Sequence, residues 1–261
     1  MFMEERQREI THIIETQGSV TVAEIVAAYG ISDESARRDL RMLEQQGLCR
    51  RTHGGALRPT QVGARPPQDR DFSAMPVYDT YDRIAAAAAA MVKKNDTVYL
   101  CGGSFGYLLL RHLPTDIPYT LVVNQVDIAK ELRGWENVEV YIAGGHMRRS
   151  GSLVDSLAVA FVSQLHFDLC FQTGSGLTAA FGLSNGTDET AAFQRAVLKN
   201  SRRRVLLMPG TKVGNEAFVR VCGVREFHTV ITDWECAPEQ LSNLRDTGVE
   251  VLCVENERTD P

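Results

Sequence analysis

The stretch Ser-Asp-Glu-Ser-Ala-Arg-Arg-Asp-Leu-Arg, residues 32–41, decides the fold of the N-terminal part of the chain. Ser32 is a good helix N-cap, and the two acidic residues after it favour the positive end of a helix dipole. Ala36, Leu40 and Leu43 follow at helical spacing, so one side of this helix is expected to pack against a core. The opposite side carries Glu34, Arg37, Arg38, Arg41 and Gln45. The stretch therefore predicts an amphipathic helix with a cationic outer face.

Apolar residues at helical spacing predict two further helices upstream, over residues 3–16 and 21–28. Gly30 follows the second, where glycine can take the positive φ that ends a helix. A short helix, a turn with glycine and a second helix rich in arginine form the layout in which the later helix enters the major groove of DNA. Arginine suits this task because its planar fork can grip phosphate or guanine with two parallel hydrogen bonds. Taken alone, such a helix could equally present a solvated charged face, so its neighbours decide between the two interpretations.

The next residues, 47–58, read Gly-Leu-Cys-Arg-Arg-Thr-His-Gly-Gly-Ala-Leu-Arg and predict a two-stranded hairpin that turns at His53, Gly54 and Gly55. Six arginines lie between residues 37 and 58 against two acidic residues, although the whole chain has a net charge of -5. A basic hairpin beside a recognition helix is expected to contact a neighbouring groove or the DNA backbone. The residues expected to face double-stranded DNA are Thr21, Ser32, Glu34, Ser35, Arg37, Arg38, Arg41, Arg50, Arg51, His53 and Gly54.

Several short motifs in this part of the chain are specific. They are Glu5-Arg6-Gln7, Arg37-Arg38-Asp39-Leu40 and Arg51-Thr52-His53-Gly54-Gly55-Ala56. Together they resemble the DeoR family of bacterial transcriptional regulators. The resemblance continues downstream through Asn124, Gly144-Gly145, Gly174, Gly176, Lys212 and Ile231-Thr232-Asp233. It implies a winged helix-turn-helix followed by an effector domain like that of sugar-phosphate isomerases, retained as a sensor of phosphorylated sugars.

The length of 261 residues favours two domains, one small and one of about 200 residues. Four prolines, at 59, 66, 67 and 76, stand among polar residues and predict an extended connector. We therefore expect a DNA-binding domain over residues 1–58, a linker over 59–76 and an effector-sensing domain over 77–256.

Short apolar runs alternate with helix-length segments in the second domain, after an alanine-rich helix predicted over residues 81–94. This alternation predicts a doubly wound, mostly parallel α/β sheet with helices on both faces, and ligands bind such folds at the carboxyl ends of the strands. The strand-like runs are residues 97–101, 120–124, 138–143, 167–172, 204–208, 229–232 and 249–254.

Glycine and small polar residues gather at those strand ends. Glycine lets the backbone approach an anion, amides at a helix start donate to it, and lysine adds a point charge. Any one of these loops could be no more than a tight turn, but five of them together favour a phosphate-binding site. The residues expected to bind a small phosphorylated effector are Gly102, Gly103, Ser104, Phe105, Gly106, Asn124, Gly144, Gly145, Gly174, Ser175, Gly176 and Lys212.

Three departures from the DeoR pattern leave two other functions open. Cys101 and Gly103-Ser104-Phe105 stand where the family usually has an acidic residue and a Gly-Thr-Thr loop, Pro209 replaces a common aspartate, and Leu153-Val154-Asp155 replaces a Gly-Pro. One alternative is a sugar-phosphate isomerase-like enzyme with an accessory DNA-binding head; the other is a regulator whose second domain only oligomerises. The enzyme would need acid-base residues, for which Asp168, Asp188, Glu189 and Asp233 are the candidates.

Other classes of site lack support in the sequence. The run Gly174 to Ala179 imitates a dinucleotide fingerprint, but Gly182 and Gly186 follow where the helix should lie, so no nicotinamide cofactor is expected. The six cysteines are spread singly without zinc-ligand spacing, so no metal is expected. No membrane span or secretory signal is visible, which favours the cytoplasm. Reading two operator half-sites requires a homo-oligomer, a dimer or a tetramer.

Overall fold

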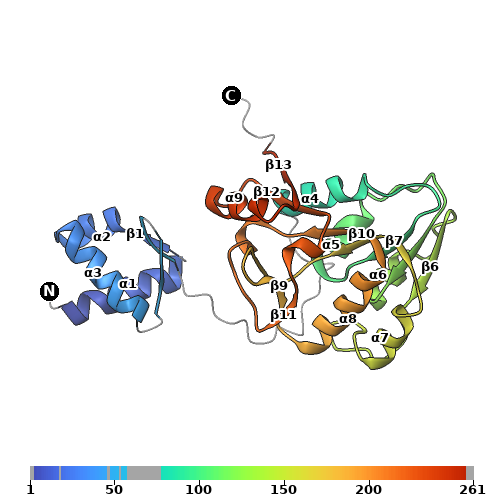
Figure 1. The fold of residues 1–261 in the computed structure, drawn as a ribbon, viewed down its shortest axis with the longest axis horizontal. Helices are drawn as coiled ribbons and strands as arrows, with labels where there is room; N and C mark the ends of the chain where they lie inside the picture. The colour runs from blue at the N-terminus through green and yellow to red at the C-terminus, as the bar shows by residue number, and fades with distance from the viewer. Residues whose placement is uncertain (1–2, 18, 46–47, 53, 58–77, 257–261) are drawn as a thin grey trace. The chain divides into compact units, whose positions relative to one another are not determined.

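A computed structural model of the chain describes residues 3–17, 19–45, 48–52, 54–57 and 78–256. The chain divides into two compact units, Met1–Gln61 and Val62–Pro261, each with its own hydrophobic core (Figure 1). The linker predicted over residues 59–76 and the predicted turn residue His53 lie outside the described residues.

The N-terminal unit has three helices and a small antiparallel sheet. The helices are α1 (Met3–Gln17), α2 (Val22–Tyr29) and α3 (Asp33–Gln45), which confirms the three predicted helices. The predicted hairpin forms from β2 (Arg50–Arg51) and β3 (Gly55–Leu57). A third strand, β1 (Ser19–Thr21), pairs with β3, so the wing has the strand order β1-β3-β2. The prediction of a two-stranded wing was incomplete. The three residues of β1 lie between two helices and are too few to show the alternation that identifies a strand.

Local side chains fix the ends of the two central helices. Thr21 and Glu24 form a reciprocal capping box at the start of α2: the Glu24 N–H donates to Thr21 Oγ1 (3.2 Å) and the Thr21 N–H to Glu24 Oε2 (2.7 Å). Gly30 ends α2 at φ 62°, in the left-handed region that favours glycine, as predicted. Ser32 Oγ accepts from the Ser35 N–H (3.2 Å), as expected of an N-cap.

The second unit is built on one seven-stranded sheet in which every neighbouring pair is parallel, in the order β13-β12-β10-β7-β4-β5-β6. All seven predicted runs are strands of this sheet. They are β4 (Thr97–Leu100), β5 (Tyr119–Val123), β6 (Val138–Ile142), β7 (Phe167–Gln172), β10 (Ser201–Leu207), β12 (Thr229–Asp233) and β13 (Glu250–Val254).

Helices flank this sheet as a doubly wound fold requires (Figure 1). The pair α4 with α5 and the pair α7 with α8 each pack together, and α4 lies against β10, β12 and β13 whereas α8 lies against β7 and β10. The helices are α4 (Asp79–Ala89), α5 (Gly103–Leu110), α6 (Val126–Glu131), α7 (Ser156–Val162), α8 (Asp188–Lys199) and α9 (Pro238–Asp246), with short 3-10 turns η2 (Gly210–Lys212) and η3 (Val224–Glu226).

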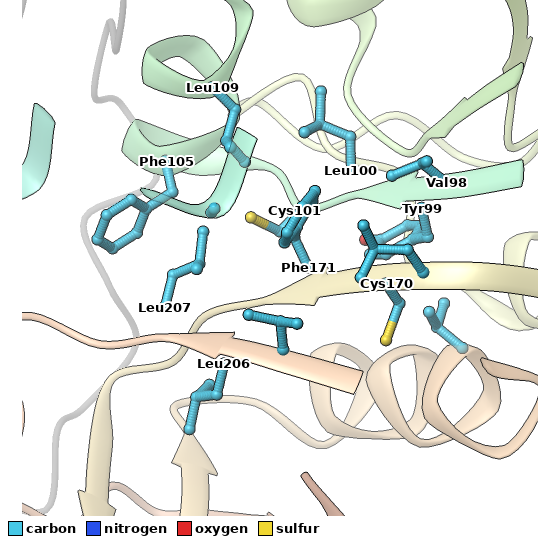
Figure 2. Close-up of a cluster of buried hydrophobic side chains, with 14 of the residues drawn as sticks. Val98, Tyr99, Leu100, Cys101, Phe105, Leu109, Cys170, Phe171, Leu206 and Leu207 are labelled. Carbon is cyan, nitrogen blue, oxygen red and sulfur yellow. The ribbon is translucent and has the colours of Figure 1, made fainter. Parts of the chain in front are cut away.

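Apolar strand residues supply the centre of the core. Figure 2 shows Val98, Leu100 and Cys101 at β4 beside Phe171 of β7 and the leucines of β10, with Phe105 and Leu109 of α5 packed nearby. These side chains are almost fully buried. Because both faces of the sheet are covered at its centre, strands β4, β5, β7 and β12 are buried almost throughout and show little alternation, whereas the edge strands β6 and β13 are more exposed.

Two features differ from the sequence prediction. Helix α4 ends at Ala89 rather than at residue 94, because i to i+3 bonds follow and the Asp96 carboxylate accepts from the Lys93 N–H (3.0 Å), which turns the chain toward β4. The structure also has a second small sheet, order β11-β9-β8, built from β8 (Gly176–Thr178), β9 (Gly182–Asn185) and β11 (Val219–Cys222). A β8–β9 hairpin therefore follows the glycines after β7, which confirms the prediction that no dinucleotide-binding helix follows them.

Candidate functional site

The outer face of α3 is cationic and turned to solvent. The side chains of Arg38 and Arg41 are exposed, and neither has a hydrogen-bond or ion-pair partner among the described residues. Arg37 Nε lies 3.2 Å from Asp33 Oδ2 one helical turn earlier, but both side chains are largely exposed. Such a surface pair contributes at most about 0.5 kcal/mol and is screened by salt.

Asp39, the acidic residue of the Arg37-Arg38-Asp39-Leu40 motif, points toward α1 and not toward solvent. It is 1% exposed, and its carboxylate accepts from Arg6 Nε (2.7 Å) and Gln7 Nε2 (3.1 Å) of α1. The motifs Glu5-Arg6-Gln7 and Arg37-Arg38-Asp39-Leu40 are therefore two halves of one contact that holds α3 against α1. The sequence analysis did not anticipate this contact, although the occurrence of both motifs in one domain was the available signal.

The wing packs closely on the entry to α2. A Cβ added to Gly55 would collide with the carbonyl oxygen of Val20, and the Val22 N–H donates to the Gly54 carbonyl (2.8 Å). The Arg51 N–H donates to Glu44 Oε1 (2.8 Å), which joins β2 to the end of α3. The predicted contact residue Thr21 is engaged in the capping box, and neither His53 nor the Arg50 side chain lies within the described residues.

A cavity of about 210 Å³ lies in the second unit at the carboxyl ends of β4, β5 and β7. The strand order reverses direction between β4 and β7, so this is the topological switch point at which doubly wound folds bind ligands. The lining residues are Tyr99, Cys101, Gly102, Gly103, Asn124, Gln125, Arg148, Ser150, Ser152, Val154, Gln172, Thr173, Asn185, Thr187, Thr190, Phe193 and Gln194.

Neutral amide side chains dominate this lining and are tied to one another. Gln194 Nε2 donates to Gln172 Oε1 (3.0 Å) and to the Thr173 carbonyl (2.7 Å), and Gln194 Oε1 accepts from Asn185 Nδ2. On the opposite side Tyr99 Oη donates to Asn124 Oδ1 (3.0 Å). All of these amides are buried. Such a network fixes donors and acceptors in a water-poor site, where hydrogen bonds discriminate strongly between ligands.

One buried donor in the network has no partner among the described residues. Gln172 is fully buried at the end of β7, and its Nε2 makes no hydrogen bond to them, although Oε1 accepts from Gln194. Leaving a buried donor unsatisfied costs about 1–3 kcal/mol. A ligand that presents an oxygen to Gln172 would recover this free energy.

Positive charge enters the cavity from Arg148. Its guanidinium donates to Thr190 Oγ1 (3.3 Å) and lies 3.0 Å from Glu189 Oε2, both in the first turn of α8. Arg148 and Thr187 also line an adjoining depression of about 560 Å³ that contains His146, Arg149, Asp188, Glu189 and the exposed ring of Phe218. The amino end of α8, capped by Thr187, adds a positive helix dipole to this region. The cavity thus has a neutral interior and one guanidinium, paired with Glu189, at its edge.

Three of the predicted effector residues line the cavity: Gly102, Gly103 and Asn124. Gly103 begins α5 at φ 73°, and its N–H donates to Gln125 Oε1 (3.2 Å). The next three predicted residues lie farther along α5, where the Phe105 ring is buried and stacks on Tyr81 at 5.0 Å between centroids. The other predicted residues lie outside this lining: Ser104, Phe105, Gly106, Gly144, Gly145, Gly174, Ser175, Gly176 and Lys212.

Close packing explains several of those glycines, because other atoms occupy the place where a Cβ would lie. A Cβ on Gly174 would collide with Leu183, and one on Gly176 with the Asn215 carbonyl. Gly145, at φ 145°, faces the carboxylate of Asp155, which caps α7. Ser175 does not line the cavity, but its Oγ donates to Asn185 Oδ1 (3.1 Å) and so helps to hold the amide network in place.

The carboxylates considered for acid-base chemistry do not line the cavity. Asp168 accepts from the Thr97 N–H (3.0 Å), and buried Asp233 accepts from the Gly210 N–H (3.0 Å). Asp188 and Glu189 lie in the first turn of α8, as predicted for a helix capped by Thr187. The cavity residues named above include neither aspartate nor glutamate.

The cysteine at the end of β4 is not a reactive nucleophile. Burial raises the pKa of the Cys101 thiol to about 12, so it is a neutral thiol at physiological pH. Within the described residues no cluster of three or more metal-ligating side chains is found, and no helix is both long and apolar enough to cross a bilayer.

Comparison with known proteins agrees with this architecture. A model of the DeoR-like helix-turn-helix domain matches residues 6–62, and a model of the DeoR C terminal sensor domain matches residues 78–234. The chain is 27% identical over 251 residues to the glycerol-3-phosphate regulon repressor of Escherichia coli K12, which covers 95% of this chain and 98% of that protein. It is 29% identical over 253 residues to the lactose phosphotransferase system repressor of Staphylococcus aureus N315, with 95% and 98% covered.

Solved structures resemble the chain only distantly. Ribose 5-phosphate isomerase A from Methanocaldococcus jannaschii gives a TM-score of 0.38 at 14% identity, covering 51% of this chain and about half, 53%, of the isomerase. The Pyrococcus horikoshii translation initiation factor eIF-2B gives 0.41 at 10% identity, covering 84% and 69%. The two family models together span both described units, and the chain belongs to the DeoR family of transcriptional regulators.

Proposed function

We propose that the chain represses an operon for carbohydrate or sugar-alcohol use and releases its operator when a phosphorylated effector occupies the cavity. The relatives support the first part, because their names include repressors of the glycerol-3-phosphate regulon and of a lactose phosphotransferase system. The shape and chemistry of the cavity support the second part. As in the sequence prediction, the partners are then double-stranded DNA, a small phosphorylated metabolite and further copies of this chain.

The observation that carries the effector proposal is the pairing of neutral buried amides with a single cation. Hydroxyl groups both donate and accept, so a polyol can satisfy Gln172 Nε2 and the Tyr99–Asn124 pair at once. A phosphate at the other end of the same molecule would meet Arg148 and the amino end of α8. The lining residues carry no carboxylate that could move a proton, which favours sensing over isomerisation.

At the DNA end, we propose that Arg38 and Arg41 of α3 enter the major groove while Arg51 and the wing approach the adjacent backbone. Two such units on one operator require at least a dimer, and the effector must bind one arrangement of the pair better than the other. Dimer and tetramer both meet this requirement.

A thermal-shift screen tests the effector proposal. The full chain is melted with sugar phosphates, sugar-alcohol phosphates and the same compounds without phosphate. We expect stabilisation by a phosphorylated compound, weaker stabilisation by its dephosphorylated form, and release of DNA from the chain's own upstream region by the same compound. Turnover of that compound, followed by NMR, would support the isomerase-like enzyme instead.

The variant Gln172→Met sharpens the screen. It removes the unpartnered donor at similar volume, and Gln194 Nε2 keeps its bond to the Thr173 carbonyl. The melting temperature without effector should therefore change little, while affinity for the effector falls about tenfold, as expected for one lost hydrogen bond. Unchanged affinity would mean that the ligand does not reach Gln172.

A further inference from the structure

A second depression, of about 600 Å³, lies on the sensor unit where the end of α8 meets β10 and β11. It shares no residue with the effector cavity or with the depression beside Arg148. Its lining contains four cationic side chains and one carboxylate, in a chain whose net charge is -5. The lining residues are Arg195, Leu198, Lys199, Arg204, Arg220, Val221, Cys222, Gly223 and Glu226.

Main-chain carbonyls hold two of these guanidinium groups in place. Arg195 Nη1 donates to the Arg220 carbonyl (2.8 Å), and Arg220 Nε donates to the Phe181 carbonyl (2.7 Å). Each bond uses one of the five N–H donors of an arginine and fixes the direction of the rest. Lys199 has no hydrogen-bond or ion-pair partner among the described residues. The two guanidinium groups of Arg195 and Arg220 are thus held in place while most of their donors stay unused.

The fourth cation, Arg204 of β10, is compensated only in part. Its Nη1 lies 3.4 Å from Glu226 Oε2, whereas its Nε is buried with no hydrogen-bond partner in the part of the chain that the structure describes. The imidazole of His228 lies beside Arg204, and its Nδ1 accepts from the Arg204 N–H (3.1 Å). Burial, and then the charges of Arg204 and Arg203, lower the pKa of His228. Like charges gathered in a depression repel one another and favour a bound anion.

The strand that forms one wall is irregular at this point. The register of β11 on β9 shifts between Arg220 and Cys222, which is a β-bulge that leaves Val221 opposite no single partner. Bulges change the direction of the side chains beside them and are enriched next to binding sites. Cys222 in this wall is not a candidate nucleophile, because burial raises its pKa to about 12.

We propose that this depression is a second anion site, which binds a small molecule carrying a diphosphate or two neighbouring phosphate groups. Arginine forks suit phosphate oxygens because each can donate two parallel hydrogen bonds, and three arginines with one lysine suit more than one phosphate. The volume lies within the range of small-molecule sites. A nucleic acid fits less well, since the cations line one depression instead of a continuous track along the surface.

Isothermal titration calorimetry of the full chain with inorganic pyrophosphate tests the proposal. We expect one saturable site per chain at low ionic strength. The exposed, unpaired Lys199 offers a safe first variant: Lys199→Gln should weaken binding about tenfold, as for one lost charge-assisted contact, and the double variant with Arg195→Gln should weaken it further. Melting curves without pyrophosphate check that both variants stay folded.

Two controls separate a built site from a general field. Arg202 lies two residues from Arg204 on β10, is 82% exposed on its side chain and does not line the depression, so Arg202→Gln should change affinity less than about twofold. Arg148→Gln alters the effector cavity and should likewise leave pyrophosphate binding intact. An equal loss in Arg202→Gln would reduce the site to diffuse electrostatics, and a loss confined to Arg148→Gln would place the anion in the effector cavity. Either result, or no saturable binding, overturns the proposal, whereas the effector screen stands independently of it.

Discussion

The two units arrange their polar side chains in opposite ways. On α3 the arginines at 38 and 41 face solvent while the apolar side chains and Asp39 face inward. In the sensor unit the neutral amides of Gln172, Gln194 and their neighbours are buried, and charge lies only at one edge of the cavity. The difference teaches that a polyanion can be held by exposed charge, at the cost of strong salt dependence, whereas a small ligand needs desolvated donors and acceptors. Variants in the effector cavity should therefore leave DNA binding without effector unchanged, whereas release of DNA by the effector depends on both units.

The largest effect is expected from Asp39→Ala. This variant leaves the largely buried Arg6 guanidinium without its carboxylate, and breaking such a buried pair costs about 3 kcal/mol or more. Hydrogen exchange measured by mass spectrometry should show faster exchange in α1 and α3, and DNA binding should fall. Both tryptophans, Trp135 and Trp234, lie in the sensor unit, so the fluorescence melting curve should stay unchanged. The matched control Asp33→Ala breaks an exposed pair and should cost less than about 0.5 kcal/mol; equal effects of the two variants would contradict a special role of Asp39.

The next effect concerns the exposed face of α3. Arg38→Ala and Arg41→Ala should each weaken binding to the upstream DNA about tenfold without changing stability. Fluorescence anisotropy over a range of salt should give a log-log slope of about -4 to -5 for the unmodified chain, reduced by about 1 in each variant. Arg8 is an exposed arginine on α1 and provides the control, because Arg8→Ala removes the same charge from another face. A slope that does not respond to either α3 variant would remove α3 from the interface.

A smaller effect should locate the phosphate group of the effector. Arg148 lines the cavity, whereas Lys212 Nζ lies 5.9 Å from the centroid of the Tyr81 ring and outside the lining. Calorimetry with the best compound of the screen should show that Arg148→Gln weakens binding about tenfold and Lys212→Gln less than about twofold. The reverse order would move the phosphate to the end of β10, as the glycine and lysine pattern of the sequence suggested.

The smallest effect is a pH dependence in the sensor unit. Desolvation of Asp155 opposes ionisation, but the backbone N–H groups of Ala158, His146, Leu157 and Asp155 itself prevail and lower the pKa of this N-cap. A lowered folded-state pKa adds stability above the ordinary carboxyl pKa, and this stability is lost as the pH falls through the folded value. Tryptophan-monitored melting between about pH 6 and pH 3 should show a shallower decline for Asp155→Asn than for the unmodified chain. Parallel curves would mean that Asp155 titrates as it does in the unfolded chain.

The fold was accessible from the sequence where the signal is periodic. Helices α1 to α3 and the seven strands of the parallel sheet follow from runs that are long enough to show their spacing. Strands β1, β8 and β9 are each only three or four residues long. Such short strands are too short to show a periodic pattern, so the sequence does not predict them.

The candidate cavity was accessible only in part for a related reason. Glycine after a strand signals a special backbone conformation, and Gly102 and Gly103 do line the cavity, but the same signal at Gly174 reflects close packing on Leu183. Gln172 ends an apolar strand and Gln194 lies within a helix, where single polar residues look like ordinary exceptions. Their meeting depends on the sheet order, which a single sequence does not encode locally.

The β8–β9 hairpin has a consequence for how such sensors diversify. It delivers Asn185, and just beyond it Thr187, to the cavity, yet its strands belong to a separate small sheet and take no part in the seven-stranded one. Ligand preference can therefore change at Asn185 and Thr187, whereas Leu177 and Leu183 of the hairpin are fully buried in the core and have to be kept. An engineer who wishes to retune the inducer would begin there, with a cassette of about ten residues grafted between β7 and α8.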